Sequence, residues 1–289
     1  MNTTHLFFSK DNVPDPFYAC IRDDPSRKDD RNFVEELWQE YAPHAEPEFL
    51  EDAKRDFHAK IWEMYLACVF LKNGFQLQKK TKKEGPDICL SVQPKPIWIE
   101  AIAPRSGTGA DAVPGYKRGV VYNETPKDKV LLRFTSAIIE KHKKYQNYIR
   151  DKIISKDDPY IIAVNGGIVP HAIVVDILSC LFSYGDPVVI FDKRTKKQVD
   201  FGHEYRDTIK KSNDAPVSTN IFEDETYNGI SAVLYSVSNV VIHPKNIGTE
   251  IQFVHNPMAK NENKLPLGIF QFGREWWREN EELKGKKWG

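Results

Sequence analysis

The sequence lacks the features that mark several common classes of protein. Its 289 residues contain no apolar run long enough to cross a membrane, so we expect no membrane partner. Residues 1–8 combine neither a basic leader nor a long apolar segment, so we expect no secretory signal and a cytoplasmic location. Lys and Arg together number 41, as do Asp and Glu, so no surplus of positive charge announces nucleic-acid binding. Any site for a polyanion must therefore be local.

Cysteine spacing and signature motifs exclude further classes. The four cysteines have no paired spacing and three of them fall within apolar runs, so we expect buried free thiols rather than a zinc site or a disulfide framework. The sequence contains no HExxH, no P-loop and no GxSxG motif. The Asn-Gly-Gly segment at 165–167 is interpreted as a turn at the end of a strand.

What the sequence does contain is typical of one α/β domain with added elements. Hydrophobic residues make up 40% of the chain and aromatic residues 12%, which is enough for a sizeable core. The clearest helix runs from Glu51 to Asn73, where apolar residues recur at three- and four-residue steps and Gly74 follows as a stop signal. This pattern predicts an amphipathic helix.

Two acids follow this helix on adjoining apolar runs. A Glu-Gly-Pro turn signal precedes Asp87, and the second run, bounded by prolines, contains Glu100 thirteen positions later. The span between them suits a hairpin whose strands bring the two carboxylates together. Two converging carboxylates would hold Mg²⁺ or Mn²⁺.

Glu63 lies in the most apolar part of the 51–73 helix, and three interpretations are open for it. It is an acid on the solvent face, or the partner of Lys60 one turn earlier, or part of a site. If the helix packs over the strands of Asp87 and Glu100, Glu63 becomes a third oxygen ligand for the cation, which would neutralise the crowded carboxylates.

The helix with an internal Glu63, the Pro-Asp turn at Asp87 and the Ile-Glu strand at Glu100 together resemble the PD-(D/E)XK nuclease superfamily. The resemblance covers residues 51–165. It implies a restriction-endonuclease-like fold, which is a mixed central sheet flanked by helices, here with N- and C-terminal additions. It also implies metal roles for Asp87 and Glu100, a supporting metal role for Glu63, and cleavage of phosphodiesters by metal-activated water.

One element of the family's motif is not in place. The family carries a lysine two positions after the glutamate, where this chain has Ile102. That lysine helps to orient and deprotonate the attacking water, so the site either recruits a cation from elsewhere or is inactive. The best candidate is Lys141, which shares the apolar face of the helix expected over 136–154. Lys144 shares that face, Lys60 is a third option, and a lysine reaching into solvent is the alternative.

The resemblance also leads to an expected division of the whole chain. We expect a single domain over residues 1–289, with an N-terminal extension over 1–48, a nuclease-like core over 49–192, and a sheet-completing or accessory part over 193–289. Residues 104–129 are expected to form a long irregular loop that faces the substrate. Further helices are expected over 32–41 and 172–182, and strands over 160–164, 188–191, 230–235 and 240–242.

Three hypotheses about function follow. The first is a magnesium-dependent DNA endonuclease of the restriction or defence type. The second is a catalytically inactive protein of the same fold that binds nucleic acid or a protein partner. The third is a structural α/β protein in which Asp87 caps a turn and Glu100 pairs with a lysine. A nucleic acid would contact the basic run Lys79–Lys83, unless this is a solvated loop, and the loop from Arg105 to Arg118. A homodimer is expected by analogy with other nucleases.

Overall fold

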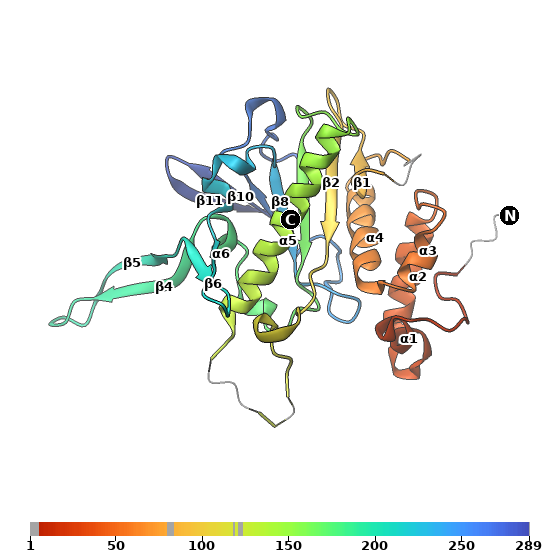
Figure 1. Ribbon diagram of the computed structural model, residues 1–289, viewed down its shortest axis with the longest axis horizontal. Coiled ribbons are helices and arrows are strands. Elements are labelled where there is room, and N and C mark those ends of the chain that lie inside the picture. Colours follow the sequence, from red (N-terminus) through yellow and green to blue (C-terminus); the bar gives the residue numbers. More distant parts are fainter. Residues whose placement is uncertain (1–5, 80–83, 118, 121–123, 289) are drawn as a thin grey trace.

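Seven strands form the mixed sheet at the centre of the structure, which is a computed structural model that describes residues 6–79, 84–117, 119–120 and 124–288 (Figure 1). The strands lie in the order β1-β2-β3-β8-β9-β10-β11. The pairs β2–β3, β3–β8 and β9–β10 are parallel and the other three are antiparallel. Their bounds are Ile88–Leu90, Ile97–Ile102, Tyr160–Asn165, Ala232–Ser236, Gln252–His255, Arg274–Glu279 and Glu282–Lys287.

Helices cover both faces of this sheet, and the alternation of buried side chains along β3 explains why. Ile161 and Ala163 belong to the cluster that contains helix α4, while Ile162 and Val164 belong to the cluster that contains helix α5. Both faces are therefore dry, which accounts for the continuous apolar run of β3. The chain belongs to the α/β class, as the sequence predicts.

The α-helices are α1 (Pro16–Asp23), α2 (Lys28–Tyr41), α3 (Phe49–Ala53), α4 (Phe57–Lys72), α5 (Lys127–Arg150) and α6 (Leu178–Leu181). Short 3-10 helices occur at Pro25–Arg27, Gly109–Asp111, Ala172–Val174, Ile221–Glu223, Glu225–Tyr227 and Asn261–Asn263. None of the helices in the described part of the chain is both long and apolar enough to cross a membrane.

The helix expected over 51–73 is two helices, and the prediction that it is amphipathic was wrong. α3 ends at Ala53, and α4 begins after Asp56, whose side chain accepts the backbone N–H of Ala59. Twelve of the sixteen residues of α4 are buried, because α1, α2 and α3 cover the side of α4 that faces away from the sheet (Figure 1). The stop at Gly74 is confirmed, with φ of +81°.

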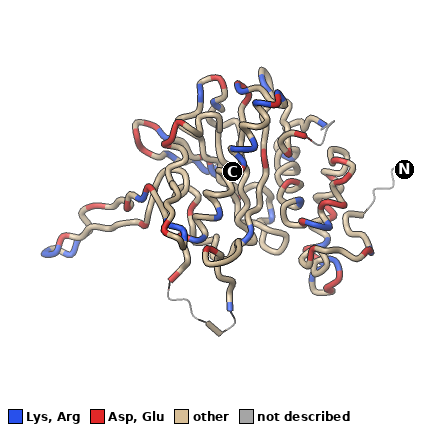
Figure 2. Tube along the Cα trace, in the orientation of Figure 1, with Lys and Arg blue, Asp and Glu red and all other residues tan. Residues whose placement is uncertain are grey.

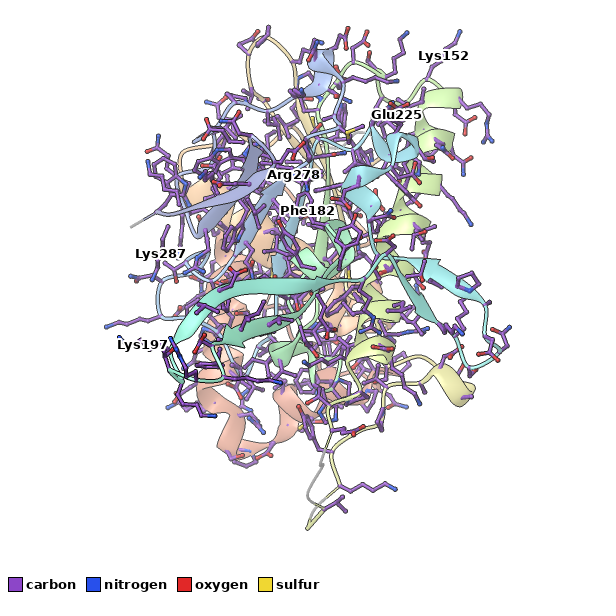
Figure 3. The ribbon with its side chains drawn as sticks, turned by 90° about the vertical axis from the view of Figure 1, so that its left-hand side faces the viewer. Lys152, Phe182, Lys197, Glu225, Arg278 and Lys287 are labelled. Atoms are coloured by element: carbon purple, nitrogen blue, oxygen red, sulfur yellow. The ribbon has the colours of Figure 1, made fainter. Side chains whose placement is uncertain are left out.

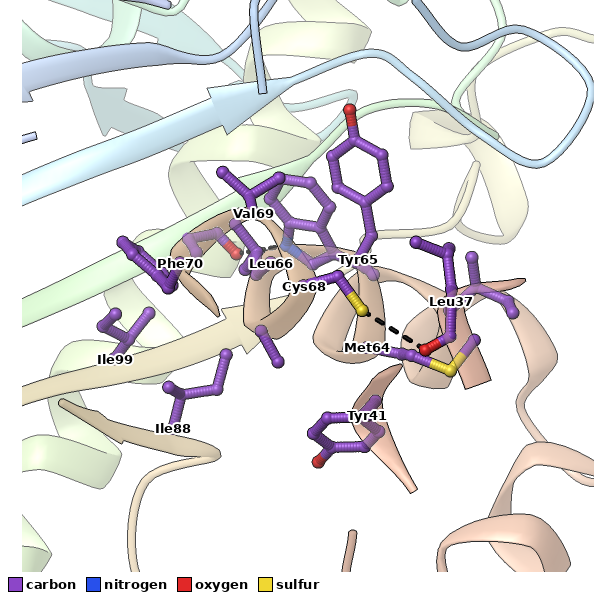
Figure 4. Close-up of a cluster of buried hydrophobic side chains, with 14 of the residues drawn as sticks. Leu37, Tyr41, Met64, Tyr65, Leu66, Cys68, Val69, Phe70, Ile88 and Ile99 are labelled. Atoms are coloured by element: carbon purple, nitrogen blue, oxygen red, sulfur yellow. Dashed lines mark hydrogen bonds between the residues drawn. The ribbon is translucent and has the colours of Figure 1, made fainter. Parts of the chain in front are cut away.

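Figure 4 shows the packing of α2 against α4 in this part of the core. The Cys68 thiol donates a hydrogen bond to the backbone oxygen of Leu37 at 3.3 Å, and Met64 and Tyr65 flank the contact. Cys68, Cys89 and Cys180 are buried free thiols, as the sequence predicts. Cys20 is exposed.

Three expected elements differ from the structure for identifiable reasons. The apolar run at 188–191 is a strand, but it lies in a separate hairpin of β4 (Tyr184–Phe191) and β5 (Gln198–Tyr205), outside the central sheet. Residues 240–242 form a turn, because the Asn239 side chain accepts the backbone N–H groups of Val241 and Ile242. The helix expected over 136–154 begins earlier, at Lys127, which shortens the preceding loop.

The segment after residue 193 contributes more sheet than the sequence indicates. β8, β9, β10 and β11 extend the central sheet beyond β3, and β6 (Thr208–Lys210) and β7 (Pro216–Ser218) pair with each other outside it. Of these strands, the sequence predicts only the one near 230–235. The helix expected over 172–182 is a 3-10 turn followed by the four residues of α6.

Candidate functional site

The hairpin of β1 and β2 places Asp87 opposite Glu100. The last paired residues are Ile88 and Ile99, and one further step of the same antiparallel register brings the two acids to facing positions. Asp87 Oδ2 accepts the backbone N–H of Ala101 at 2.8 Å, which holds the carboxylate beside β2. The hairpin that the sequence predicts is confirmed, and β1 begins directly after Asp87.

Glu100 is completely buried and its carboxylate meets three side chains of α5. Lys141 Nζ and Lys144 Nζ each lie 2.7 Å from Glu100 Oε1. The Tyr148 hydroxyl lies 3.2 Å from Glu100 Oε2 and 3.0 Å from the backbone oxygen of Gly85. These α5 residues follow one another at three- and four-residue steps, so they share the helix face that packs on the sheet.

The charges of this cluster depend on one another. Burial raises the pKa of Glu100 above its ordinary value and the nearby Asp87 adds to the effect, while Lys141 and Lys144 oppose it. Burial also acts to lower the pKa of Lys144, but the attraction of Glu100 outweighs it and the pKa of Lys144 is raised. Lys141 and Lys144 therefore favour the ionised form of Glu100, which burial and Asp87 oppose.

Glu63 is buried on α4 and takes the pairing with Lys60. Glu63 Oε2 lies 2.7 Å from Lys60 Nζ, and Glu63 Oε1 accepts the Tyr41 hydroxyl at 3.0 Å. Burial acts to lower the pKa of Lys60, but Glu63 and, to a smaller extent, Asp87 raise it. The carboxylates of Glu63 and Asp87 therefore both attract the ammonium of Lys60. Lys60 lies on the face of the sheet opposite to Lys144.

These residues surround an open cleft of about 680 Å³ at the edge of the sheet where β1 begins. Its walls include Lys60 from α4, Asp87 from the hairpin, and Lys144 and Tyr148 from α5. Glu100 and Lys141 lie behind this wall: only 13% of the Lys141 side chain is exposed, against 45% of that of Lys144. The cleft gives a ligand access to Asp87 and Lys144 at once.

The donor set suits a hydrated divalent cation better than a fully coordinated one. Within the described ranges, no group of three or more His, Cys, Asp or Glu side chains is placed to hold a metal ion. Mg²⁺ commonly uses one or two carboxylates and retains several waters. Asp87 lines the open cleft, and Glu100 faces Asp87 from behind the wall of the cleft. Glu63, with its two oxygens on Lys60 and Tyr41, is not grouped with them.

The structure describes only part of the basic segments that are expected to contact a nucleic acid. Residues 80–83 of the basic run and Arg118 lie outside the described residues. Arg105 pairs with Asp56 at 3.0 Å. His58 of α4 is buried, and its Nε2 lies 2.9 Å from Asn165 Oδ1 at the end of β3. The turn at 165–167 is confirmed, because Asn165 Oδ1 also accepts the Gly167 N–H.

Two tyrosines complete the cluster. Tyr148 is seven positions after Lys141, and the sequence places it on the same face of the helix, which was the available signal. Tyr41 lies on α2, and no spacing relates it to Glu63. Comparison of the chain with protein-family models, with curated proteins and with solved structures finds no match, so the site is interpreted from its own geometry.

Proposed function

We propose that this protein is a divalent-metal-dependent nuclease with a restriction-endonuclease-like core, which hydrolyses phosphodiesters in DNA. The observation that carries the proposal is the facing of Asp87 and Glu100 across the hairpin, with two α5 lysines on Glu100. Acids and ammonium groups of this kind are what phosphodiester hydrolysis by metal-activated water requires.

The order of elements supports the fold part of the proposal. The helix that carries Glu63 is followed by an extended segment, in which Leu77 bridges to Leu90, then by β1, β2, α5 and β3. The helix of Glu63 thus precedes the hairpin of Asp87 and Glu100, in the order on which the family resemblance rests. β3 then joins β2 in parallel, and α4 and α5 contact β2 from opposite faces of the sheet.

Asp87 and Glu100 would hold the cation, Mg²⁺ or Mn²⁺. A cation bound there supplies Lewis acidity, which lowers the pKa of a bound water and stabilises negative charge on the phosphate. Glu100 is held in place by Tyr148 and Lys141, and Asp87 is held by the N–H of Ala101. The chain thus fixes both carboxylates before any ligand arrives.

The two lysines have different parts in this proposal. Lys144 lines the cleft and nearly half of its side chain is exposed, so its ammonium is the one that reaches a scissile phosphate. Lys141 is more deeply placed and acts as a positioning residue that keeps Glu100 ionised. Together they take the place of the lysine absent at Ile102.

One observation favours a second candidate function. Glu100 is already neutralised by Lys141 and Lys144, so the cluster is electrostatically satisfied by protein groups. A catalytically inactive protein of this fold, which binds nucleic acid through the cleft, would show the same contacts. Metal binding and cleavage separate the two candidates.

The test is incubation of the purified protein with supercoiled plasmid, single-stranded DNA and single-stranded RNA, each in Mg²⁺, in Mn²⁺ and in EDTA. The proposal expects strand scission of DNA in either metal and none in EDTA. Calorimetric titration with Mn²⁺ accompanies it. Absence of both Mn²⁺ binding and scission for every substrate would favour the inactive binding protein.

A further inference from the structure

The β4–β5 hairpin forms an arm that extends from the body of the molecule (Figure 1). Each of its strands has eight residues, which is about 26 Å of extended chain at about 3.3 Å per residue. Seven apolar side chains on it are between 36% and 68% exposed: Val188, Val189, Ile190, Phe191, Val199, Phe201 and Tyr205. A two-stranded sheet with this much exposed apolar surface is typical of a segment that another chain covers.

The tip of the arm is basic. Lys193, Arg194, Lys196 and Lys197 follow β4 within six positions, and in the described part of the chain none of the four forms an ion pair. Asp192 beside them is engaged in the turn, because its Oδ1 accepts the backbone N–H groups of Arg194 and Thr195. Figure 2 shows the cluster of positive residues at the far end of the arm, and Figure 3 shows Lys197 there.

The base of the arm is acidic. A groove of about 900 Å³ lies between the base of the arm and the body, with walls that include Tyr184, Pro187, Phe201 and Trp276. Its charged lining comprises the acids Asp176, Asp186, Glu281 and Glu282 against the cations Lys127 and Arg206. Three ion pairs involve this lining: Asp186 with Lys127, Glu282 with Lys284 and Arg206 with Asp128. Asp176 and Glu281 are the remaining acids, and they leave this acidic groove with a net negative lining.

The order along the arm is therefore a basic tip, an apolar middle and an acidic base. In a second arm that runs in the opposite direction, the order is acidic, apolar and basic. The two orders are complementary, because each basic end lies opposite an acidic end. A twofold interface requires this kind of self-complementarity, because the same patch serves both partners. Two arms that run antiparallel would match in charge at both ends and in apolar character between them.

We propose that a second copy of this chain pairs with the first through antiparallel arms, each basic tip entering the acidic groove of the other copy. Val189 and Phe201, which face each other across the strands, lie in the apolar middle of the contact. The pairing covers exposed hairpin surface that would otherwise be open to aggregation. This inference does not depend on the nuclease activity proposed above.

A nucleic acid duplex would also attract the basic tip, but it fits the rest of the arm poorly. Bases offer little apolar surface in the major groove apart from the thymine methyl group. The acids of the groove, Asp176 and Glu281 among them, would repel phosphates approaching the base of the arm. The second copy accounts for all three parts of the arm.

Sedimentation velocity over a range of protein concentrations tests the proposal with two charge-reversed chains. One carries Lys193→Glu, Arg194→Glu, Lys196→Glu and Lys197→Glu, and the other carries Glu281→Lys and Glu282→Lys. We expect a dimer for the unchanged chain and at least tenfold weaker dimerisation for each variant alone. Mixed one to one, the two variants should form a dimer again, because tip and groove are then opposite in charge in both contacts.

A monomer at every concentration of the unchanged chain would overturn the proposal, as would a mixture that fails to restore the dimer. Circular dichroism checks that both variants are folded, and Phe201→Asp in the apolar middle gives an independent variant that should also be monomeric. Fluorescence anisotropy with a DNA duplex tests the alternative that the hairpin binds nucleic acid. Loss of duplex affinity in the tip variant, with dimerisation unchanged, would identify the arm as a nucleic-acid contact and overturn the proposal.

Discussion

Glu100 Oε1 lies 2.7 Å from Lys141 Nζ, although 41 residues separate them in the sequence. The family resemblance places a lysine two positions after the glutamate. In this chain the ammonium group beside Glu100 comes instead from the neighbouring helix α5. A helix face can supply it because Lys141 and Lys144 are three positions apart and point to the same strand. Ile102 at the end of β2 is then free to pack.

Replacement of the two lysines separates their parts in the proposed reaction. Lys144→Met should reduce the cleavage rate by about 10² or more, since the ammonium that faces the cleft is lost. Lys141→Met should also lower the rate and should raise the apparent pKa of the pH–rate profile, because Glu100 loses a neutralising charge. Single-turnover cleavage across a pH series measures both effects.

Lys143→Met is the matched control, because Lys143 lies on the same helix and is exposed. It should cleave at the unchanged rate. Equal activity in Lys143→Met and Lys144→Met would remove Lys144 from the proposed chemistry.

Neutral replacement of the site carboxylates should leave the fold intact. Burial and Asp87 both make the ionised form of Glu100 costly, and an isosteric amide removes that cost while Lys144 turns toward solvent. We therefore expect Glu100→Gln and Asp87→Asn to keep the free energy of unfolding within about 1 kcal/mol, or to raise it. Urea unfolding measures this, and a loss of several kcal/mol would show that Glu100 mainly serves the packing of α5.

The sequence predicts the centre of the site because that part depends on local chemistry. The Glu-Gly-Pro turn signal before Asp87 and the prolines that bound the second run predict the hairpin. The three- and four-residue spacing predicts the face of α5 that carries Lys141. The environment of Glu63 is less accessible from sequence, because its contact with Tyr41 depends on how α2 crosses α4. Non-local packing of this kind leaves no periodic signal.

Non-local packing also limits what the sequence predicts for the β4–β5 arm and for strands β10 and β11. The apolar run at 188–191 has the pattern of a buried strand, and its exposure depends on whether a partner covers it. β11 is the edge strand of the sheet and β10 lies next to it, and both are rich in charged residues. These charged side chains mask the strand character of β10 and β11 in the sequence.

Asp15 should be a strong determinant of stability. Its Oδ1 accepts the N–H groups of Phe17 and Tyr18 at the start of α1, and its Oδ2 accepts the N–H of Phe57 at the start of α4. Asp15→Ala should lower the free energy of unfolding by about 2–3 kcal/mol, because two buried donors and one partly buried donor lose their acceptor. Asp24→Ala, which removes an exposed cap, should cost about 1 kcal/mol or less. Equal losses in urea unfolding would contradict this assignment.

His142 should make the protein less stable in acid. Burial lowers its pKa below the ordinary value of 6.5, so below that pH the unfolded chain binds a proton more readily than the folded one. Its contribution to stability is complete above about pH 6.5 and is lost as the pH falls through the lowered pKa. His142→Phe, which keeps the ring beside Tyr227, should reduce the drop in unfolding free energy between pH 7.5 and 5 by about 1 kcal/mol. An unchanged drop in the variant would exclude His142 as the cause.

The most direct test of the central claim is plasmid nicking in Mg²⁺ by three proteins: the unchanged chain, Glu100→Gln, and Glu140→Gln as the exposed control on α5. The account predicts nicking by the unchanged chain and the control, none in EDTA, and a loss of at least 10³ in rate for Glu100→Gln. Nicking by Glu100→Gln at the rate of the control would contradict the assignment of the site.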